Sequence, residues 1–312
     1  MSSIPDVSVL MPVFNAEKFL KIAIESILNQ TYQHFELIIV DDGSTDSSPN
    51  IVKSFDHEKI RYYKNDTNIG LIATLNRGIN LCSGKYIARM DADDISLPTR
   101  LEEQVAFLNN NSDYVLIGSN TERIDSEGIL IRKKKYYCEA NLIRTKLFFK
   151  NTFAHSSVMI RKEIFDEFRY DSRYIYAEDY HLWIQLASKY RIANLNKTLV
   201  RYRVHNESIS AKKNVEQKAT IQNIQSQILA EMQIIATAKE LDLHYRLLNT
   251  PQKISLLDLN ERRNINTWID RLKTQNKLLK IYNETFFEKM LDGRWSILKQ
   301  LHILFLKIIK KK

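Results

Sequence analysis

Strand-like and helix-like segments alternate over the first hundred residues, and this alternation limits the fold more than any other feature of the sequence. The pattern predicts strands at residues 7–13, 35–40, 60–65 and 86–91, and helices at residues 16–29 and 70–81. Strands that alternate with helices pair in parallel, because each crossover returns the chain to the same edge of the sheet. The sequence therefore predicts an α/β fold with a mixed, mostly parallel, Rossmann-like sheet flanked by helices.

Acidic and amide residues come just after several of these predicted strands. They are Asn15, Asp41, Asp42, Asn68 and the acidic run from Asp91 to Asp94. In open α/β sheets, ligands bind beyond the carboxyl ends of the strands. We therefore expect these side chains to converge on one edge of the sheet.

The stretch MDADD (residues 90–94) crowds three carboxylates at a strand end, where they repel one another unless another group offsets their charge. Oxygen donors at this spacing suit Mg²⁺ or Mn²⁺ that keeps positions open for the phosphates of a substrate. A polar turn that caps the following helix is the alternative. An EF-hand loop is excluded, because Ser96 stands where that loop requires glycine.

The stretch VDDGSTD (residues 40–46) ends a strand in two carboxylates and then turns into a helix. Ser44 or Thr45 caps that helix, which explains the turn but not Asp41 and Asp42. A carboxylate here can accept a hydrogen bond from the imide N–H of a nucleobase such as uracil.

The rest of the chain divides into two further regions, so that we expect three in all, at residues 1–105, 106–210 and 211–312. The middle region has a mixed pattern, with strands near residues 114–118 and 156–160 and a helix that starts near Glu178. The last region is helical. One amphipathic helix from Asn214 to about Leu248 is predicted by the helical spacing of Ile221, Ile224, Ile228, Met232 and Ile235.

Composition is that of an ordinary soluble globular protein, with 44% hydrophobic and 27% charged residues. Cys82 and Cys138 lie far apart without metal-like spacing, which predicts a reducing compartment and no disulfide framework. The N-terminus lacks a signal-peptide pattern, and no apolar run approaches the ~20 residues that span a bilayer. We expect a cytoplasmic protein, with the inner face of the cytoplasmic membrane as its peripheral location.

The net charge of +9 is concentrated at the C-terminus. Fourteen Lys and Arg against six Asp and Glu lie between Pro251 and Lys312, whereas the rest of the chain is nearly balanced. The closing stretch WSILKQLHILFLKIIKKK has apolar residues at helical spacing among lysines. Packing on the core is the common role of such a stripe. With this charge we expect a helix on an anionic membrane surface and no nucleic acid partner.

Four stretches of the sequence follow one another in the order and spacing of a single enzyme family. They are VSVLMPVFNAEKFLKIAIESILNQTYQHFELIIVDDGSTDSS, NIGLIATLNRGI, GKYIARMDADDI and AEDYHLW. Over roughly residues 5–210 the chain resembles glycosyltransferase family 2. It is most similar to the bacterial β-1,3-N-acetylglucosaminyl- and β-1,3-galactosyltransferases of lipopolysaccharide and capsule synthesis. The resemblance implies a GT-A fold, an inverting reaction, a UDP-sugar donor and a divalent cation, Mn²⁺ or Mg²⁺.

The resemblance also implies roles for individual residues. Those expected to bind the nucleotide sugar are Pro12, Val13, Phe14, Asn15, Asp41, Asp42, Asn68, Arg89, Asp91 and Ala92, with Asp42 on uracil and Asp91 near the ribose. Those expected to bind the metal are Asp93 as direct ligand, Asp91 and His205. Asp179 is expected to be the general base, with Glu178 and His155 near the acceptor. Each role has a structural alternative, because acids at a helix start complement its dipole and a lone histidine is usually structural.

The implied function is transfer of a sugar from a UDP donor to a hydroxyl of a lipid-linked, lipopolysaccharide or capsule glycan. The expected sugar is N-acetylglucosamine in β-1,3 linkage, and β-1,3-galactosyl transfer from UDP-galactose is the alternative. Residues 1–105 would then bind the nucleotide sugar, residues 106–210 would hold the acceptor and the catalytic base, and residues 211–312 would form a helical, basic extension.

Two other classes of protein stay open. A phosphatase of the haloacid dehalogenase type would use Asp91 as nucleophile and Asp93 as acid. Ile95 departs from that motif, and the loop follows a fourth strand rather than the first. A nucleotide-sugar-binding subunit without catalysis is the other rival, although it would not need the metal-binding acids together with Asp179.

Overall fold

The computed structural model describes residues 4–205, 212–249 and 259–293, and the chain divides into two compact units. Unit 1 comprises Met1–Ala140 and Thr152–Asn214, and unit 2 comprises Asn141–Asn151 and Val215–Lys312. The two units are described separately below.

A nine-stranded mixed sheet forms the centre of unit 1, counted over the described residues. Its strands are β1 (Val7–Val13), β2 (Phe35–Asp41), β3 (Ile60–Lys64), β4 (Tyr86–Arg89), β5 (Ile95–Ser96), β6 (Tyr114–Ile124), β7 (Leu130–Lys134), β8 (Met159–Arg161) and β9 (Arg191–Arg203). Their order is β3-β2-β1-β4-β8-β6-β9-β5, with β7 paired to β6. β1 to β4 run parallel, and β8 lies antiparallel between β4 and β6. The predicted α/β class is confirmed.

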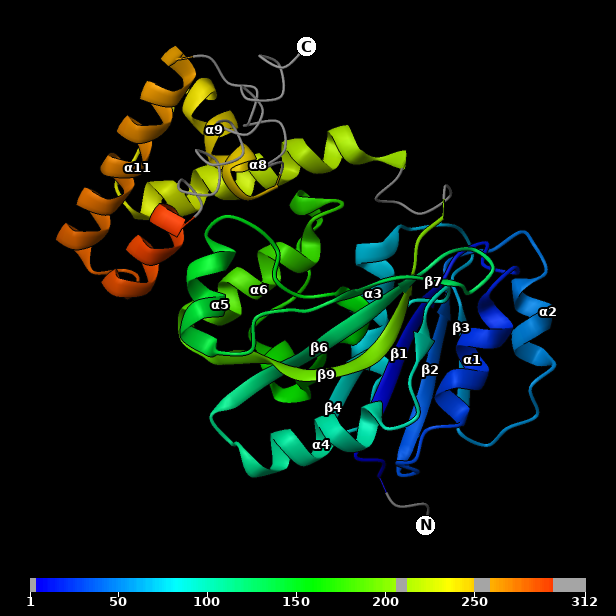
Figure 1. Cartoon of the computed structure of the whole chain (residues 1–312). Coiled ribbons are helices and arrows are strands. Elements are labelled where there is room, and N and C mark those ends of the chain that lie inside the picture. The colour runs from blue at the N-terminus through cyan, green and yellow to red at the C-terminus, as the bar shows by residue number, and fades with distance from the viewer. Residues whose placement is uncertain (1–3, 206–211, 250–258, 294–312) are drawn as a thin grey trace. The chain divides into compact units, whose positions relative to one another are not determined.

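Helices cover both faces of the parallel strands, with α1 and α2 on one face and α3 on the other (Figure 1). The helices of unit 1 are α1 (Leu20–Leu28), α2 (Ser48–Lys53), α3 (Leu71–Leu81), α4 (Arg100–Asn110) and α6 (Glu178–Lys189), with 3₁₀ turns η1 (His155–Ser157), η2 (Lys162–Asp166) and η3 (Ser172–Tyr174). Because both faces are covered, β1 and β2 are buried along their whole length. This burial explains why most of their residues are apolar and do not alternate with polar ones.

Two element boundaries differ from those predicted. α1 begins at Leu20 rather than residue 16, and the backbone before it bonds to the loop after β2 and to the start of α2. The Ala16 N–H donates to Ser48 Oγ at 2.9 Å, and the Glu17 N–H donates to Asp46 Oδ2 at 2.9 Å. The strand expected from residue 156 begins at residue 159, because residues 155–157 form η1.

Unit 2 is helical within the described residues. Its helices include α5 (Ala140–Leu147), α8 (Asn214–Glu231), α9 (Ala238–Asn249) and α11 (Leu259–Leu279), and residues 284–293 are also helical. The single helix expected from Asn214 to Leu248 is wrong, because two helices occupy this range. Thr237 caps α9: its Oγ1 accepts from the Glu240 N–H at 3.3 Å, and Glu240 Oε2 accepts from the Thr237 N–H at 2.8 Å. This reciprocal pair starts a new helix. Ile235, expected on the buried stripe, is 89% exposed in the turn.

The predicted membrane-binding helix at the C-terminus lies in residues 294–312, outside the described part of the chain. Among the helices that the structure describes, none has the length and apolar character needed to cross a membrane.

Gln233 should tolerate glycine, because its φ of 56° lies in the left-handed region that glycine adopts without strain. We expect Gln233→Gly to leave the free energy of unfolding unchanged or to raise it by up to about 1 kcal/mol. The matched control Gln227→Gly, at an exposed position inside α8, should lower it by roughly 0.5–1 kcal/mol. Urea unfolding measures both values. If both variants lose the same free energy of unfolding, the left-handed backbone at Gln233 in the turn between α8 and α9 is contradicted.

Candidate active site

The loops after β1 and β2 lie together at the carboxyl edge of the sheet. Asn15 joins them: its N–H donates to Ser44 Oγ at 3.0 Å, and its Oδ1 accepts from the Thr45 N–H at 2.9 Å. Asn15 has a φ of 47°, a left-handed conformation uncommon for residues other than glycine. Pro12 and Val13 are buried in β1, whereas Phe14 and Asn15 are exposed. Of the four consecutive residues at the end of β1 and just after it that were predicted to bind the nucleotide sugar, two therefore face solvent at this edge.

Asp41 and Asp42 are both buried, and their carboxylates hold neighbouring loops in place. Asp41 accepts from the Tyr62 hydroxyl at 2.6 Å and from the Ser44 N–H at 2.8 Å. Asp42 accepts from the side chain of Asn65 at 2.7 Å and from two backbone N–H groups, of residues 69 and 70, at 2.9 Å each. These bonds fix the loop that carries the exposed Asn68 and leads into α3.

The acidic run after β4 brings Asp91, Asp93 and Asp94 together, with one oxygen of each lying within 4.8 Å of the others. Asp91 forms an ion pair with Arg89, and Asp93 Oδ2 lies 3.0 Å from His205 Nε2. Ala92, between them in the chain, is 9% exposed. Arg89 thus supplies positive charge beside the acidic run, in addition to any cation that binds there.

Asp94 differs from the other two acids because it is completely buried. Its carboxylate accepts from the Ser156 hydroxyl and from the Arg203 N–H, the latter at 2.7 Å. Burial, and then the charges of Asp93 and Asp91, raise the pKa of Asp94 well above its ordinary value. Asp94 therefore joins the end of β4 to β9 and to η1, whereas the side chains of Asp91 and Asp93 stay 29% and 31% exposed.

The donor atoms at this position fit a small divalent cation. Asp91 and Asp93 offer hard carboxylate oxygens that are partly open to solvent, and His205 offers an imidazole nitrogen beside Asp93. Asp94 fits less well, because its oxygens already accept two hydrogen bonds inside the protein.

Arg89 pairs with Asp91 of the acidic cluster, and its charge also acts on His155. Arg89 is 4% exposed, and among the described residues no acceptor bonds its Nε. His155 Nε2 lies 2.8 Å from the Tyr170 hydroxyl. Burial, and then the charge of Arg89, lower the pKa of His155 well below 6.5, so that its ring is neutral.

Glu178 and Asp179 form the first turn of α6, where their charges complement the helix dipole. The preceding Tyr176 has a φ of 69°, a strained conformation of the kind that collects at functional sites. Burial, and then the charge of Asp179, raise the pKa of Glu178 to about 7, and the charges of Arg89 and Asp91 also act on it. The predicted catalytic pair therefore lies within electrostatic reach of the acidic cluster.

Ser156 and Tyr170 were missed by the sequence analysis, although they contact Asp94 and His155. The only local signal was a polar pair, Ser156 and Ser157, inside an otherwise apolar segment. Ser156 lies 62 residues from Asp94 in the chain, and Tyr170 lies 15 residues from His155, so no local pattern reveals these contacts.

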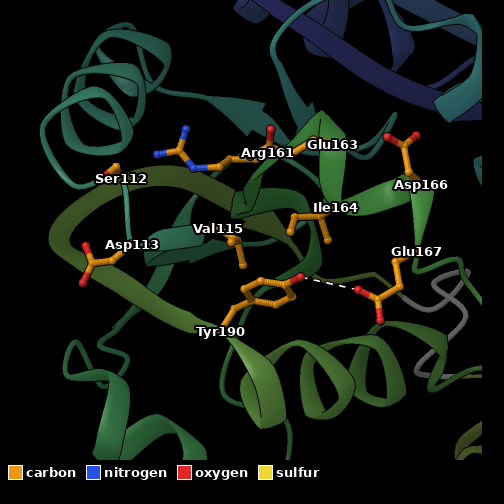
Figure 2. A pocket seen from close by; sticks show the side chains of 9 residues that line it. All are labelled: Ser112, Asp113, Val115, Arg161, Glu163, Ile164, Asp166, Glu167 and Tyr190. Carbon is orange, nitrogen blue, oxygen red and sulfur yellow. Dashed lines mark hydrogen bonds between the residues drawn. The ribbon is translucent and has the colours of Figure 1, made fainter.

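A separate pocket of about 570 Å³ opens at the opposite edge of the sheet, where β6 and β9 begin (Figure 2). Asp113, Arg161, Glu163 and Glu167 are among its lining residues, and the Tyr190 hydroxyl donates to Glu167 at 3.4 Å. None of the predicted site residues lines this pocket, so it is not part of the candidate active site.

Comparison with protein families identifies the enzyme class. The family model described as glycosyl transferase family 2 matches residues 8–169, just over half of the chain. The chain belongs to glycosyltransferase family 2. Of the classes that the sequence left open, this match supports the glycosyltransferase and not the phosphatase.

Two named relatives of this family 2 glycosyltransferase come from Escherichia coli. The O-antigen biosynthesis glycosyltransferase WbnJ is 36% identical over 65% of this chain and 81% of its own. A β-1,3-glucosyltransferase, WfgD, named for UDP-Glc and α-D-GlcNAc-diphosphoundecaprenol, is 29% identical over 68% of this chain and 82% of its own.

Solved structures share the fold of the glycosyltransferase. Residues 1–349 of TarS from S. aureus, in complex with UDP-GlcNAc, superpose with a TM-score of 0.64 at 17% identity, over 97% of this chain and 92% of that fragment. The mannosyltransferase PcManGT from Pyrobaculum calidifontis in complex with GDP-Man and Mn²⁺ gives a TM-score of 0.57 at 16% identity, over 97% and 88%.

Glu178→Gln should remove a pH-dependent part of the stability of the glycosyltransferase. Because the pKa of Glu178 is raised to about 7 from an ordinary value of 4.5, the folded state keeps a proton that the unfolded state releases between these values. The stability of the wild type relative to Glu178→Gln should therefore fall as the pH rises from about 5 to about 8, by on the order of 1–3 kcal/mol.

Urea unfolding of both proteins across this pH range measures the difference. Glu163→Gln, at an exposed glutamate, controls for the substitution itself. If the difference in the free energy of unfolding between the wild type and Glu178→Gln stays constant with pH, Glu178 titrates as an ordinary carboxyl group.

Proposed function

We propose that this glycosyltransferase moves N-acetylglucosamine, in β-1,3 linkage, from a UDP donor to a hydroxyl of a lipid-linked, lipopolysaccharide or capsule glycan. UDP-galactose is the alternative donor. One observation carries the proposal: Asp91 pairs with Arg89 at the end of β4 and lies within 4.8 Å of the oxygens of Asp93 and Asp94, and the charges of Arg89 and Asp91 act on Glu178. The relatives named for O-antigen synthesis and for a UDP-sugar and lipid diphosphate support this class of substrate.

The nucleotide sugar would bind along the edge formed by β1, β2 and β4. Phe14 and Asn15 are exposed there, and Asn68 lies on the loop that Asp42 holds. In this proposal Pro12, Val13, Asp41 and Asp42 shape the nucleoside site from below, with Asp42 toward uracil. Arg89 and Ala92 would complete the floor near the diphosphate.

A divalent cation, Mn²⁺ or Mg²⁺, would be held by Asp91, Asp93 and His205. Their partly open oxygens and the adjacent imidazole support this set, as does the Mn²⁺ in the structure of PcManGT. When bound, the cation stabilises the charge that the departing diphosphate gains. Arg89, already paired with Asp91, would keep that carboxylate oriented toward the site.

Asp179 would act as the general base. Its carboxylate would take the proton of the acceptor hydroxyl as that oxygen attacks the anomeric carbon, and UDP would leave from the opposite face with inversion. The neighbouring Glu178 has a pKa of about 7. It would donate a hydrogen bond to the acceptor when protonated and accept one from it when ionised. The neutral His155 would line the acceptor side.

Each of the three regions of the chain would have a separate role in the reaction or in membrane attachment. Residues 1–105 would bind the donor, and residues 106–210 would hold the acceptor and the base. The basic region at residues 211–312 would attach the protein to an anionic membrane surface on the cytoplasmic side.

Replacing the proposed base should separate transfer from binding. We expect Asp179→Asn to lower the transfer rate by roughly 10²–10⁴-fold while keeping UDP affinity within about threefold, because the lost proton acceptor faces the sugar acceptor and not the nucleotide. UDP release from UDP-N-acetylglucosamine with simple glycosides, and calorimetry of UDP binding, measure the two effects. Asp166→Asn, at an exposed acid, is the control. A normal transfer rate in Asp179→Asn would rule out this base.

Replacing the proposed metal ligand should instead weaken binding. We expect Asp93→Ala to abolish the dependence of UDP affinity on Mn²⁺ and to lower turnover by about a hundredfold or more. Asp66→Ala, at an exposed acid in the loop after β3, is the matched control. A panel of UDP-N-acetylglucosamine, UDP-galactose and UDP-glucose, with and without Mn²⁺, would also identify the donor. Full Mn²⁺ dependence in Asp93→Ala would contradict the assignment.

A further inference from the structure

The segment from residue 129 to residue 135, here called the hairpin segment, exposes apolar side chains on both of its faces. Ile129, Leu130 and Ile131 are 65%, 49% and 57% exposed. Ile129 comes just before β7, and Leu130 and Ile131 begin it, after a tight turn that follows β6 (Figure 1). Because successive residues of a strand point to opposite faces, exposure of all three means that the start of β7 stands clear of the core.

A block of positive charge follows these aliphatic residues directly. Arg132, Lys133, Lys134 and Lys135 complete the hairpin segment, which contains no acidic residue. Arg132, Lys133 and Lys135 are exposed. Glu122 on the neighbouring strand pairs with Lys133 at 3.5 Å, but it also pairs with Arg201 at 3.1 Å. The hairpin segment is therefore both apolar and strongly cationic.

Arg203 fastens the base of this hairpin to the candidate active site. Its Nη1 donates to the backbone carbonyls of Asp125 and Ser126 at 3.0 and 3.1 Å, and its Nε donates to the carbonyl of Asp93 at 2.8 Å. Arg203 is 3% exposed, so these bonds are inside the protein. The hairpin segment thus leaves the rim of the site at a fixed place.

Other exposed apolar side chains adjoin the same rim. Phe14 follows β1, Ile69 donates its N–H to Asp42, Ile175 precedes α6 and Val204 follows β9. Their exposed fractions are 49%, 49%, 51% and 38%. Apolar side chains around a polar site mark a surface that meets another apolar phase or partner.

We propose that the hairpin segment docks this glycosyltransferase onto a bilayer that contains anionic phospholipid, with the rim of the active site toward the membrane. Ile129, Leu130 and Ile131 enter the boundary between headgroups and acyl chains, and the following cations contact lipid phosphates. This inference rests on the proposed function in one respect, because a lipid-linked acceptor would present its hydroxyl at that surface.

Charge decides between the bilayer and a second copy of the chain. β7 is paired only with β6 among the described residues, so its other edge could join the same strand of another molecule. In an antiparallel pair along the whole of β7, Arg132 of one molecule would lie opposite Arg132 of the other, and lysines on an edge strand oppose such pairing. An anionic surface removes the repulsion instead.

Co-sedimentation of the full chain with vesicles tests the proposal. The vesicles are phosphatidylcholine with and without phosphatidylglycerol, and the variants are Ile129→Ser with Ile131→Ser and, separately, Arg132→Glu with Lys135→Glu. We expect each pair to lower partitioning onto the anionic vesicles by roughly tenfold or more. The controls are Ile22→Ser on α1, and Lys21→Glu with Lys53→Glu on α1 and α2, all at exposed positions. They should bind like the wild type.

Equal partitioning of the hairpin variants and the wild type would overturn the proposal, since the basic C-terminus is present in all of them. A dimer that the hairpin substitutions dissociate, with vesicle binding unchanged, would also overturn it and identify a second copy as the occupant. UDP binding is measured in parallel on the same proteins. Failure of the wild type to bind UDP would remove the proposed function and leave the vesicle result standing.

Discussion

Charge compensation at the end of β4 is the constraint on which the rest of the site depends. Three carboxylates that approach within 4.8 Å of one another disfavour their own ionised forms. The chain offsets this with Arg89 beside Asp91, and with the Ser156 hydroxyl and the Arg203 N–H on Asp94. Because these groups come from β4, η1 and β9, the acidic run is stable only when all three segments are assembled.

This compensation gives the acids two different tasks. Asp94 is fixed inside and joins strands, whereas Asp91 and Asp93 keep part of their surface open to a ligand. Arg203 extends the same arrangement outward, because its guanidinium group bonds both the backbone of Asp93 and the turn between β6 and β7. The geometry of the site and the position of the exposed hairpin therefore depend on one buried side chain.

Sequence patterns were most reliable where one element carries its own signal. The start of α6 at Glu178 and the extent of α3 follow from apolar spacing and from the acids of the first turn. The break between α8 and α9 also had a local signal, the Thr237 to Glu240 capping pair, which the apolar spacing overrode. The start of α1 was predicted four residues too early, and the backbone before it bonds to Ser48, which lies 32 residues away in the chain.

The sequence alone determined the family, the alternation of strands and helices, and the identity of the acids at the strand ends. Each of these depends on residues that are close together in the chain. Only the tertiary structure decided which acid is buried and which is open. That choice depends on Ser156 and Arg203, which lie 62 and 109 residues from Asp94 in the chain. Burial and hydrogen bonding are properties of the assembled sheet, so chemically identical carboxylates three residues apart acquire different roles.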